Sequence, residues 1–291
     1  MNDIPFGGKD SNWTDYKSAK IIILPVPYDY TATWQKGANL GPDAILEASA
    51  HVELYDIETD IEVHLYGIHT FQLRHLPKSP EELTEIIRQN FSSFIEDGKF
   101  PVMLGGNHSV TPGAVQGIKE YFSDLTVLQL DAHADLRESY NGSPFNHACV
   151  MARIKELCSA IQVGIRSIDR EEYDRLDTSR VFFARDILFR NDWVDNVVEL
   201  LSSHVYVTID LDVFDPSIMP STGTPEPGGL GWYQIIELLE KVAKERHVVG
   251  FDVVELMPNK HNKAPDFMAA KLVYKFLSYI FKNREIPVDT R

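Results

Sequence analysis

Short apolar runs rich in isoleucine and valine recur along the 291-residue chain and alternate with helical patterns. The runs are too short for buried helices, and their β-branched content is typical of strands covered on both faces. Strands that alternate with helices predict a mostly parallel sheet between two helical layers. We therefore expect an α/β fold, a three-layer α-β-α sandwich, formed by a single domain over residues 1–291. The expected strands are residues 21–26, 101–104, 125–130, 161–165, 181–183, 205–209 and 248–251.

The helix expected over residues 78–98 carries the clearest local signals. Ser79 can cap its start, Pro80 suits its first turn, and Gly98 can end it. Its apolar face is formed by Leu83, Ile86, Ile87, Phe91, Phe94 and Ile95. Residues 25–42, by contrast, are rich in aromatic side chains, glycine and proline, and we expect them to form a loop near the mouth of a pocket.

The charge of the chain narrows the classes of partner. Acidic residues number 43 against 28 basic ones, and the net charge of −15 disfavours nucleic acid and anionic membranes but attracts a cationic ligand. No apolar stretch approaches the about 20 residues of a membrane span, and the start, MNDIPFGGKD, lacks the regions of a signal peptide, so we expect a cytoplasmic protein. Cys149 and Cys158 lie in one expected helix and argue against a disulfide framework or a thiolate metal site.

Histidine and carboxylate side chains directly follow four of the expected strands. They are His108; Asp131, His133 and Asp135; Asp210, Asp212 and Asp215; and Asp252 and Glu255. The carboxyl ends of parallel strands meet at one edge of a sheet, so these groups should converge. On an extended segment alternate side chains share a face, so the three ligands of Asp-Ala-His-Ala-Asp can point together, as can Asp210 and Asp212. Gathered carboxylates repel one another unless a cation lies between them, which predicts a metal site.

The candidate ligands indicate both the metal and the number of ions. They are His108, Asp131, His133, Asp135, Asp210 and Asp212. Two imidazoles and four carboxylates without a thiolate suit Mn²⁺ better than structural zinc. Six ligands are too many for one small ion, but if Asp131 and Asp210 bridge, the others divide evenly between two ions roughly 3.5–4 Å apart. Such a pair lowers the pKa of a shared water and supplies a hydroxide nucleophile for a cationic substrate.

The same residues lie in a pattern that resembles the signature blocks of the ureohydrolases, the arginase and agmatinase family. The blocks are LGGNHSVTPG (104–113), LQLDAHAD (128–135) and TIDLDVFDPSIMPSTGTPEPGG (208–229), and the match extends in the family's order to KGANLGPDAILEAS (36–49), VGIRS (163–167) and FDVVELMP (251–258). The resemblance implies an arginase-like fold, two Mn²⁺ per subunit, cleavage of a guanidinium group to urea and an amine, and assembly as a homotrimer or homohexamer. It assigns one ion to His108, Asp131, Asp135 and Asp210, and the other to Asp131, His133, Asp210 and Asp212.

The resemblance also assigns two catalytic side chains. It places Glu255 against the substrate guanidinium, where a carboxylate would orient that planar cation; the alternative is a packing or surface carboxylate. It places His147 at the mouth of the site as a proton shuttle, a role that suits imidazole because the departing amine must gain a proton near neutral pH. Asn146 and His147 also open an expected helix, HACVMARIKEL, so capping is an alternative role.

The identity of the substrate is less directly indicated by the sequence than the reaction. Residues 136–143, LRESYNGS, lack the Ile-Asn pair and the Ser/Thr-rich stretch by which arginases read an amino acid, and they look more like the agmatinase branch. Agmatine, cleaved to putrescine and urea, is therefore the leading substrate, and N1-aminopropylagmatine, arginine, guanidine and other guanidino compounds are alternatives. Three positions depart from common family residues and leave the substrate open: Asn107 for an acid, Ala134 for threonine and Ala148 for glycine.

Three other classes of protein share part of this sequence pattern. In calcineurin-like phosphoesterases Gly-Asn-His follows Asp-x-His, whereas here residues 106–108 come first. A deacetylase of the same fold would need one Zn²⁺ and fewer ligands. An inactive ureohydrolase-fold subunit with a binding or structural role is the remaining alternative; a chain released from catalysis has no physical reason to keep so many mutually repelling acids, and its metal content would distinguish it.

Overall fold

The computed structural model describes residues 4–8 and 14–282, so part of the N-terminal segment used above to argue against a signal peptide lies outside the described residues. Eight strands among these residues form one sheet in the order β2-β1-β3-β8-β7-β4-β5-β6, and every neighbouring pair is parallel. The strands are β1 Ile21–Val26, β2 Ile68–Thr70, β3 Phe100–Gly105, β4 Thr126–Leu130, β5 Ser159–Ile165, β6 Val181–Phe183, β7 His204–Asp210 and β8 His247–Val254.

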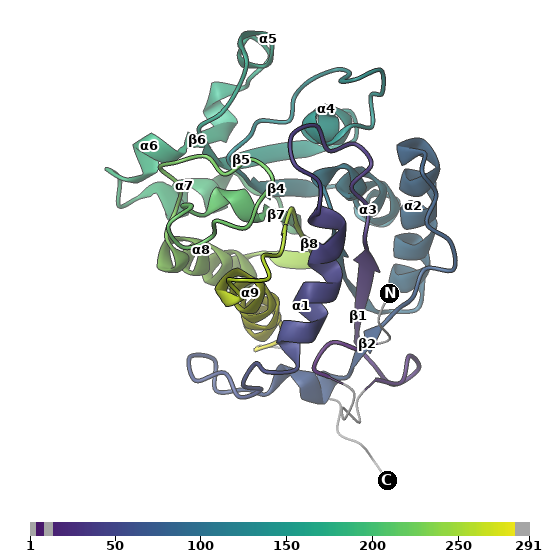
Figure 1. The fold of residues 1–291 in the computed structure, drawn as a ribbon. Coiled ribbons are helices and arrows are strands. Elements are labelled where there is room, and N and C mark those ends of the chain that lie inside the picture. The colour runs from purple at the N-terminus through teal and green to yellow at the C-terminus, as the bar shows by residue number, and fades with distance from the viewer. Residues whose placement is uncertain (1–3, 9–13, 283–291) are drawn as a thin grey trace.

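Helices cover both faces of this sheet (Figure 1). The α-helices are α1 Gly41–Ser49, α2 Pro80–Glu96, α3 Thr111–Lys119, α4 Val150–Lys155, α5 Arg170–Tyr173, α6 Ala184–Ile187, α7 Trp193–Leu200, α8 Trp232–Glu245 and α9 Ala264–Phe281. Shorter 3₁₀ helices are η1 Ala38–Leu40, η2 Val63–Tyr66, η3 His108–Val110, η4 His147–Cys149, η5 Thr178–Arg180 and η6 Leu211–Val213. No helix of the described part is both long and apolar enough to span a membrane.

Two apolar cores make the three layers. Helices α1, α7, α8 and α9 pack on one face of the sheet, and α2, α3 and α4 pack on the other. Strand β1 shows why both faces are apolar: Ile21 and Ile23 enter the first core, whereas Ile22 and Leu24 enter the second. Side chains alternate along a strand, so a continuous apolar run covers both faces. The predicted α-β-α sandwich is confirmed.

The seven predicted strands are all present, and β2 was missed. It is three residues long, pairs with β1 alone at the edge of the sheet, and only its first residue is buried. An edge strand half open to solvent needs no apolar run, so the pattern gave no signal. Helix α2 follows its prediction closely: Ser79 accepts the N–H of Glu82 at 3.2 Å, and Gly98 takes a left-handed φ of 65° just beyond the helix end.

Three local expectations were wrong. The helix expected over HACVMARIKEL is the 3₁₀ turn η4 followed by α4, which ends at Lys155, because Cys149 has the non-helical φ of −119° between them; Cys158 therefore lies outside the helix. The loop expected over residues 25–42 spans residues 27–37, because Pro42 belongs to the first turn of α1. Residues 131–135 are not extended, because Asp135 has a left-handed φ of 52°.

Candidate metal and catalytic site

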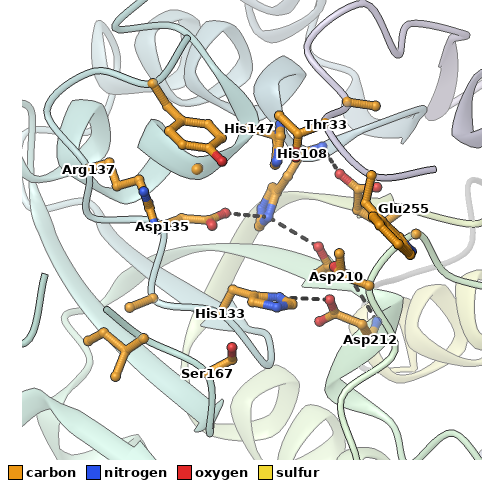
Figure 2. Close-up of a pocket in the computed structure, with 18 of the residues that line it drawn as sticks. Thr33, His108, His133, Asp135, Arg137, His147, Ser167, Asp210, Asp212 and Glu255 are labelled. Atoms are coloured by element: carbon orange, nitrogen blue, oxygen red, sulfur yellow. Dashed lines mark hydrogen bonds and ion pairs between the residues drawn. The ribbon is translucent and has the colours of Figure 1, made fainter. Parts of the chain in front are cut away.

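The predicted site residues converge at the carboxyl ends of four neighbouring strands, β3, β8, β7 and β4 (Figure 2). His108 opens η3 just after β3, and Glu255 directly follows β8. Asp210 ends β7 with Asp212 in the 3₁₀ turn beyond it, and the Asp-Ala-His-Ala-Asp segment follows β4. Residues separated by up to about half of the chain therefore meet because the strand order interleaves early and late strands.

Two histidines each face several carboxylates. The Nδ1 atom of His108 lies 3.1 Å from Oδ2 of Asp131, 3.2 Å from Oδ2 of Asp135 and 3.5 Å from Oδ2 of Asp210. The Nδ1 atom of His133 lies 2.9 Å from Oδ2 of Asp212 and 3.7 Å from Oδ1 of Asp131. Two groups have ligand atoms that all lie within 4.8 Å of one another and could hold an ion: His108 with Asp131 and Asp135, and Asp131 with His133 and Asp212.

Asp131 belongs to both groups, as expected of a bridging ligand, while Asp210 belongs to neither. One oxygen of Asp210 faces His108, and the other accepts the N–H of Asp212 at 2.9 Å. The second bridging role predicted for Asp210 therefore stays a prediction. Asp215, the further acid after β7, lies outside this cavity and accepts the N–H groups of Ser217, Gly228 and Gly229, which shapes a loop.

The donor set fits cations on physical grounds. Among the described residues, the buried Nδ1 of His108 makes no hydrogen bond of acceptable geometry although carboxylate oxygens surround it. Burial and the neighbouring Asp131 raise the pKa of Asp135 to about 7, and burial with Asp212 and Asp131 raises the pKa of Asp210 well above its usual value. Carboxylates that resist ionisation beside an unused imidazole nitrogen are what a metal ion would stabilise.

Backbone strain places two of the side chains. Asp135 and Glu255 have the left-handed φ values of 52° and 65°, a conformation that costs a non-glycine residue about 1–3 kcal/mol. The carbonyl of Asp135 accepts the N–H of Met151, which ties the strained residue to the start of α4. The N–H of Glu255 donates to the carbonyl of Gly106 at 2.7 Å; a Cβ at Gly106 would stand only 2.1 Å from a backbone oxygen of Tyr28, so glycine is required there.

Glu255 faces the cavity from the side opposite Asp135, which lies in the segment after β4 (Figure 2). Its Oε1 accepts the main-chain N–H of His108 at 2.7 Å, which fixes the side chain and leaves the second oxygen without a hydrogen bond among the described residues. Burial raises the pKa of Glu255 to about 8. A cation that enters the cavity would favour the ionised form of this buried carboxyl group, so Glu255 is placed to pair with it.

His147 lines the same cavity, and its Nδ1 is buried without a hydrogen-bond partner in the described residues. Burial lowers the pKa of His147 to about 4, so the ring is neutral near pH 7. The neighbouring Asn146 performs the capping, since its side chain accepts the N–H of Ala148. The ring of His147 is therefore free for a role in the cavity.

The cavity has a volume of about 320 Å³ and opens between two polar and aromatic walls. One wall is the loop after β1, where Thr33, Trp34 and Gln35 line the opening and Trp34 is 75% exposed. This confirms that the loop lies at a pocket mouth. In the other wall Arg137 pairs with Asp169 at 2.7 Å and stacks on the ring of Tyr140, which lies 4.6 Å away.

Comparisons with known proteins agree with this geometry. The model of the arginase family matches residues 19–278. The chain belongs to the arginase family. It is 37% identical to the N(1)-aminopropylagmatine ureohydrolase of Synechocystis sp. over 91% of this chain and 90% of that protein. It is 39% identical to the agmatinase of Pyrococcus horikoshii over 89% of this chain and 92% of that protein. The solved agmatine ureohydrolase of Thermoplasma volcanium superposes with a TM-score of 0.84 at 33% identity, over 92% of each chain.

Of the three departures from the common arginase-family residues, Asn107 and Ala134 have a local explanation, and nothing in the structure explains Ala148. Asn107 is buried. Its Nδ2 donates to the hydroxyl of Thr31 at 2.7 Å, and its side-chain oxygen accepts from Ser109 at 2.7 Å. The amide therefore joins the loop of residues 27–37 to η3. Ala134 is buried in the second core, and the carbonyl of Ala148 accepts the N–H of Arg137. None of the three substitutions removes a candidate ligand.

Several residues that support the site carry weaker sequence signals. Gln129 lies in the apolar strand β4, and its amide donates to Oδ2 of Asp131 at 2.7 Å. Arg166, in the VGIRS block, donates to the carbonyls of Asp212 at 2.6 Å and Glu226 at 2.9 Å and so holds two loops together. A polar residue inside an otherwise apolar strand was the available signal for Gln129, because a buried polar group needs a partner.

Proposed function

We propose that this arginase-family chain, acting as one domain, is a dinuclear Mn²⁺ hydrolase that cleaves the guanidinium group of agmatine to putrescine and urea. The observation that carries the proposal is the shared position of Asp131 in two ligand groups, with Glu255 facing the same cavity. Metal ligands alone would fit a storage or structural site, whereas a carboxylate opposite them gives a cationic substrate a place to bind.

The ions would be held by the six predicted ligands. They are His108, Asp131, His133, Asp135, Asp210 and Asp212. All six donors are imidazole nitrogen or carboxylate oxygen, a set that suits Mn²⁺. When bound, the two ions would lower the pKa of a water molecule that they share and so supply the nucleophile.

Two protein side chains, Glu255 and His147, would orient the substrate and transfer a proton. The oxygen of Glu255 that makes no hydrogen bond to His108 binds the guanidinium and holds its central carbon toward the metal ligands. Binding therefore places the reacting carbon in position for attack. As the new C–O bond forms and the C–N bond to the alkyl chain breaks, the departing nitrogen must gain a proton. His147, neutral at the cavity wall, carries that proton between the water and the amine. The products are urea and an alkylammonium ion, so charge balances.

The negative charge of the chain favours a substrate with a cationic tail. The net charge is −15, and Asp169 and Glu172 line the cavity beside Arg137, which pairs with Asp169 at 2.7 Å. The overall charge would attract a cationic tail and repel the carboxylate of arginine. N1-aminopropylagmatine is the second candidate, because relatives such as the Synechocystis protein are named N(1)-aminopropylagmatine ureohydrolase.

We further propose that the protein is cytoplasmic and assembles as a homotrimer or homohexamer, with no role for nucleic acid or membrane. The charge of −15 supports the last part because it disfavours polyanionic partners.

The test is urea release by the Mn²⁺-loaded protein on agmatine, N1-aminopropylagmatine, arginine and guanidine in parallel. We expect agmatine to give the highest kcat/KM and arginine to lie at least about tenfold lower, because the negative charge of the chain favours a cationic tail over a carboxylate. A preference for N1-aminopropylagmatine would favour the second candidate. Absence of urea from all four compounds, with two ions bound, would leave a metal-binding protein and overturn the proposal.

A further inference from the structure

A chain of buried hydrogen bonds leads away from the candidate ligand His108 on the side opposite the cavity. Its Nε2 lies 2.8 Å from the hydroxyl of Thr208, and that hydroxyl donates to Oδ1 of Asp252 at 2.6 Å. Thr208 on β7 and Asp252 on β8 are register partners in the sheet. Their exposed fractions are 0%, and that of His108 is 1%, so water does not complete any of these bonds.

The hydrogen atoms in this chain can be counted. The Asp252 carboxylate accepts on both oxygens, since Tyr206 donates its hydroxyl to Oδ2 at 2.7 Å. Burial raises the pKa of Asp252, but donors on both oxygens oppose protonation because they stabilise the charged form. Thr208 has one hydrogen and gives it to Asp252, so it must accept from His108. The proton of a neutral His108 then lies on Nε2, and the lone pair lies on Nδ1.

That lone pair points into the acidic cluster, where Nδ1 lies 3.1 Å from an oxygen of Asp131 and 3.2 Å from one of Asp135. We propose that Asp252, acting through the hydroxyl of Thr208, is a positioning residue that fixes His108 with Nδ1 ready to bind a metal ion. A partner on the far nitrogen of a metal-binding histidine holds both its tautomer and its ring orientation. The inference rests on the proposed function, because His108 needs this tautomer only if it binds an ion.

A purely structural role explains the arrangement less well. Apolar side chains at both register positions would continue the apolar strands and would avoid the cost of burying a carboxylate. The hydroxyl of Thr111 lies 3.5 Å from that of Thr208, too far to replace Asp252 as its acceptor. The buried carboxylate of Asp252 is therefore best explained by its role as an acceptor: it makes Thr208 donate to Asp252 and accept from His108.

The test is Mn²⁺ binding by metal-stripped protein, measured by calorimetry and by counting bound ions, in four variants. We call the hydrogen bonds from His108 through Thr208 to Asp252 the relay. Thr208→Val keeps the shape of the side chain and removes the hydroxyl that forms the relay. Asp252→Asn introduces a donor, so the hydrogen bonds of the relay can run in the opposite direction. We expect both to bind one of the two ions about 10- to 100-fold more weakly than the natural protein. Thr208→Ser keeps the hydroxyl and should restore natural affinity. Tyr206→Phe keeps the bond from Thr208 to Asp252 but removes the donor to the other carboxylate oxygen, so it should weaken binding of the same ion less than Thr208→Val does.

Thermal unfolding of each metal-free variant shows whether the fold is retained and separates a folding defect from a binding defect. Natural affinity in a folded Thr208→Val protein, while the unmutated chain binds two ions, would overturn the relay alone. Failure of the unmutated chain to bind Mn²⁺ would instead overturn the proposed function, and the relay with it. Weaker binding in Thr208→Ser as well would point to packing rather than to the hydroxyl and would also count against the relay.

Discussion

Replacing Asp131 with alanine should remove bound Mn²⁺ and lower urea release by about a thousandfold or more. Asp131 is fully buried, and it is the one residue shared by the two groups of potential ligands. Its loss removes one of the two carboxylates from each group, and metal catalysis supplies several kcal/mol of the barrier reduction. The measurement is metal content per subunit together with urea release at saturating agmatine.

Asp215→Ala is the matched control for this variant. Asp215 also follows β7 but holds loop N–H groups outside the cavity, so its loss should leave both ions bound even if the loop is less stable. Metal-free Asp131→Ala should still fold but should unfold at a somewhat lower temperature than the metal-free parent. The amide of Gln129 and the N–H of His133 lose their acceptor, which outweighs the lower repulsion within the acidic cluster. Full activity with two ions in Asp131→Ala would refute the shared-ligand assignment.

Replacing Glu255 with glutamine should keep both ions and lower kcat/KM about 100-fold or more, a loss of about 3 kcal/mol. The amide has nearly the shape of the carboxylate and can still accept the N–H of His108, so the local structure is preserved. The substitution removes the negative charge that would pair with the guanidinium in the cavity. Steady-state kinetics on agmatine, with metal content measured on the same samples, checks the prediction.

Glu226→Gln supplies the control for loss of a nearby charge. The carboxylate of Glu226 lies 3.9 Å from Nε2 of His133, too far for a hydrogen bond, and its side chain is partly exposed. We expect its rate to change only a few-fold, because solvent screens an exposed charge. Equal losses in the two variants would mean that Glu255 acts through the general field of the site and does not bind the substrate directly.

The three layers of the fold were predictable because a strand that is buried on both faces consists of consecutive apolar residues. Strands such as β1 are continuous apolar runs, and each run feeds two cores. The edge strand β2 has no such apolar run, because it is short and half-buried. The strand order was not predictable, since pairing β3 with β8 depends on contacts between residues about 150 positions apart.

The candidate ligands could be listed from sequence, but their arrangement could not. The pattern of alternate residues suggested that Asp131, His133 and Asp135 share a face of an extended segment. In the structure they converge because Asp135 adopts a left-handed backbone held by the start of α4. Such a conformation depends on tertiary hydrogen bonds, which local spacing does not encode. Thr208 and Asp252 likewise become meaningful only once β7 and β8 are known to pair.

The most direct measurement is urea release from agmatine as a function of Mn²⁺ bound per subunit, starting from metal-stripped protein. If the six ligands hold two cooperating ions, the rate should be negligible without metal and should rise steeply as the second ion binds. Full activity in protein shown to contain no metal would contradict a dinuclear hydrolase. So would a fully loaded protein, natively folded and oligomeric, that releases no urea from any guanidino compound tested.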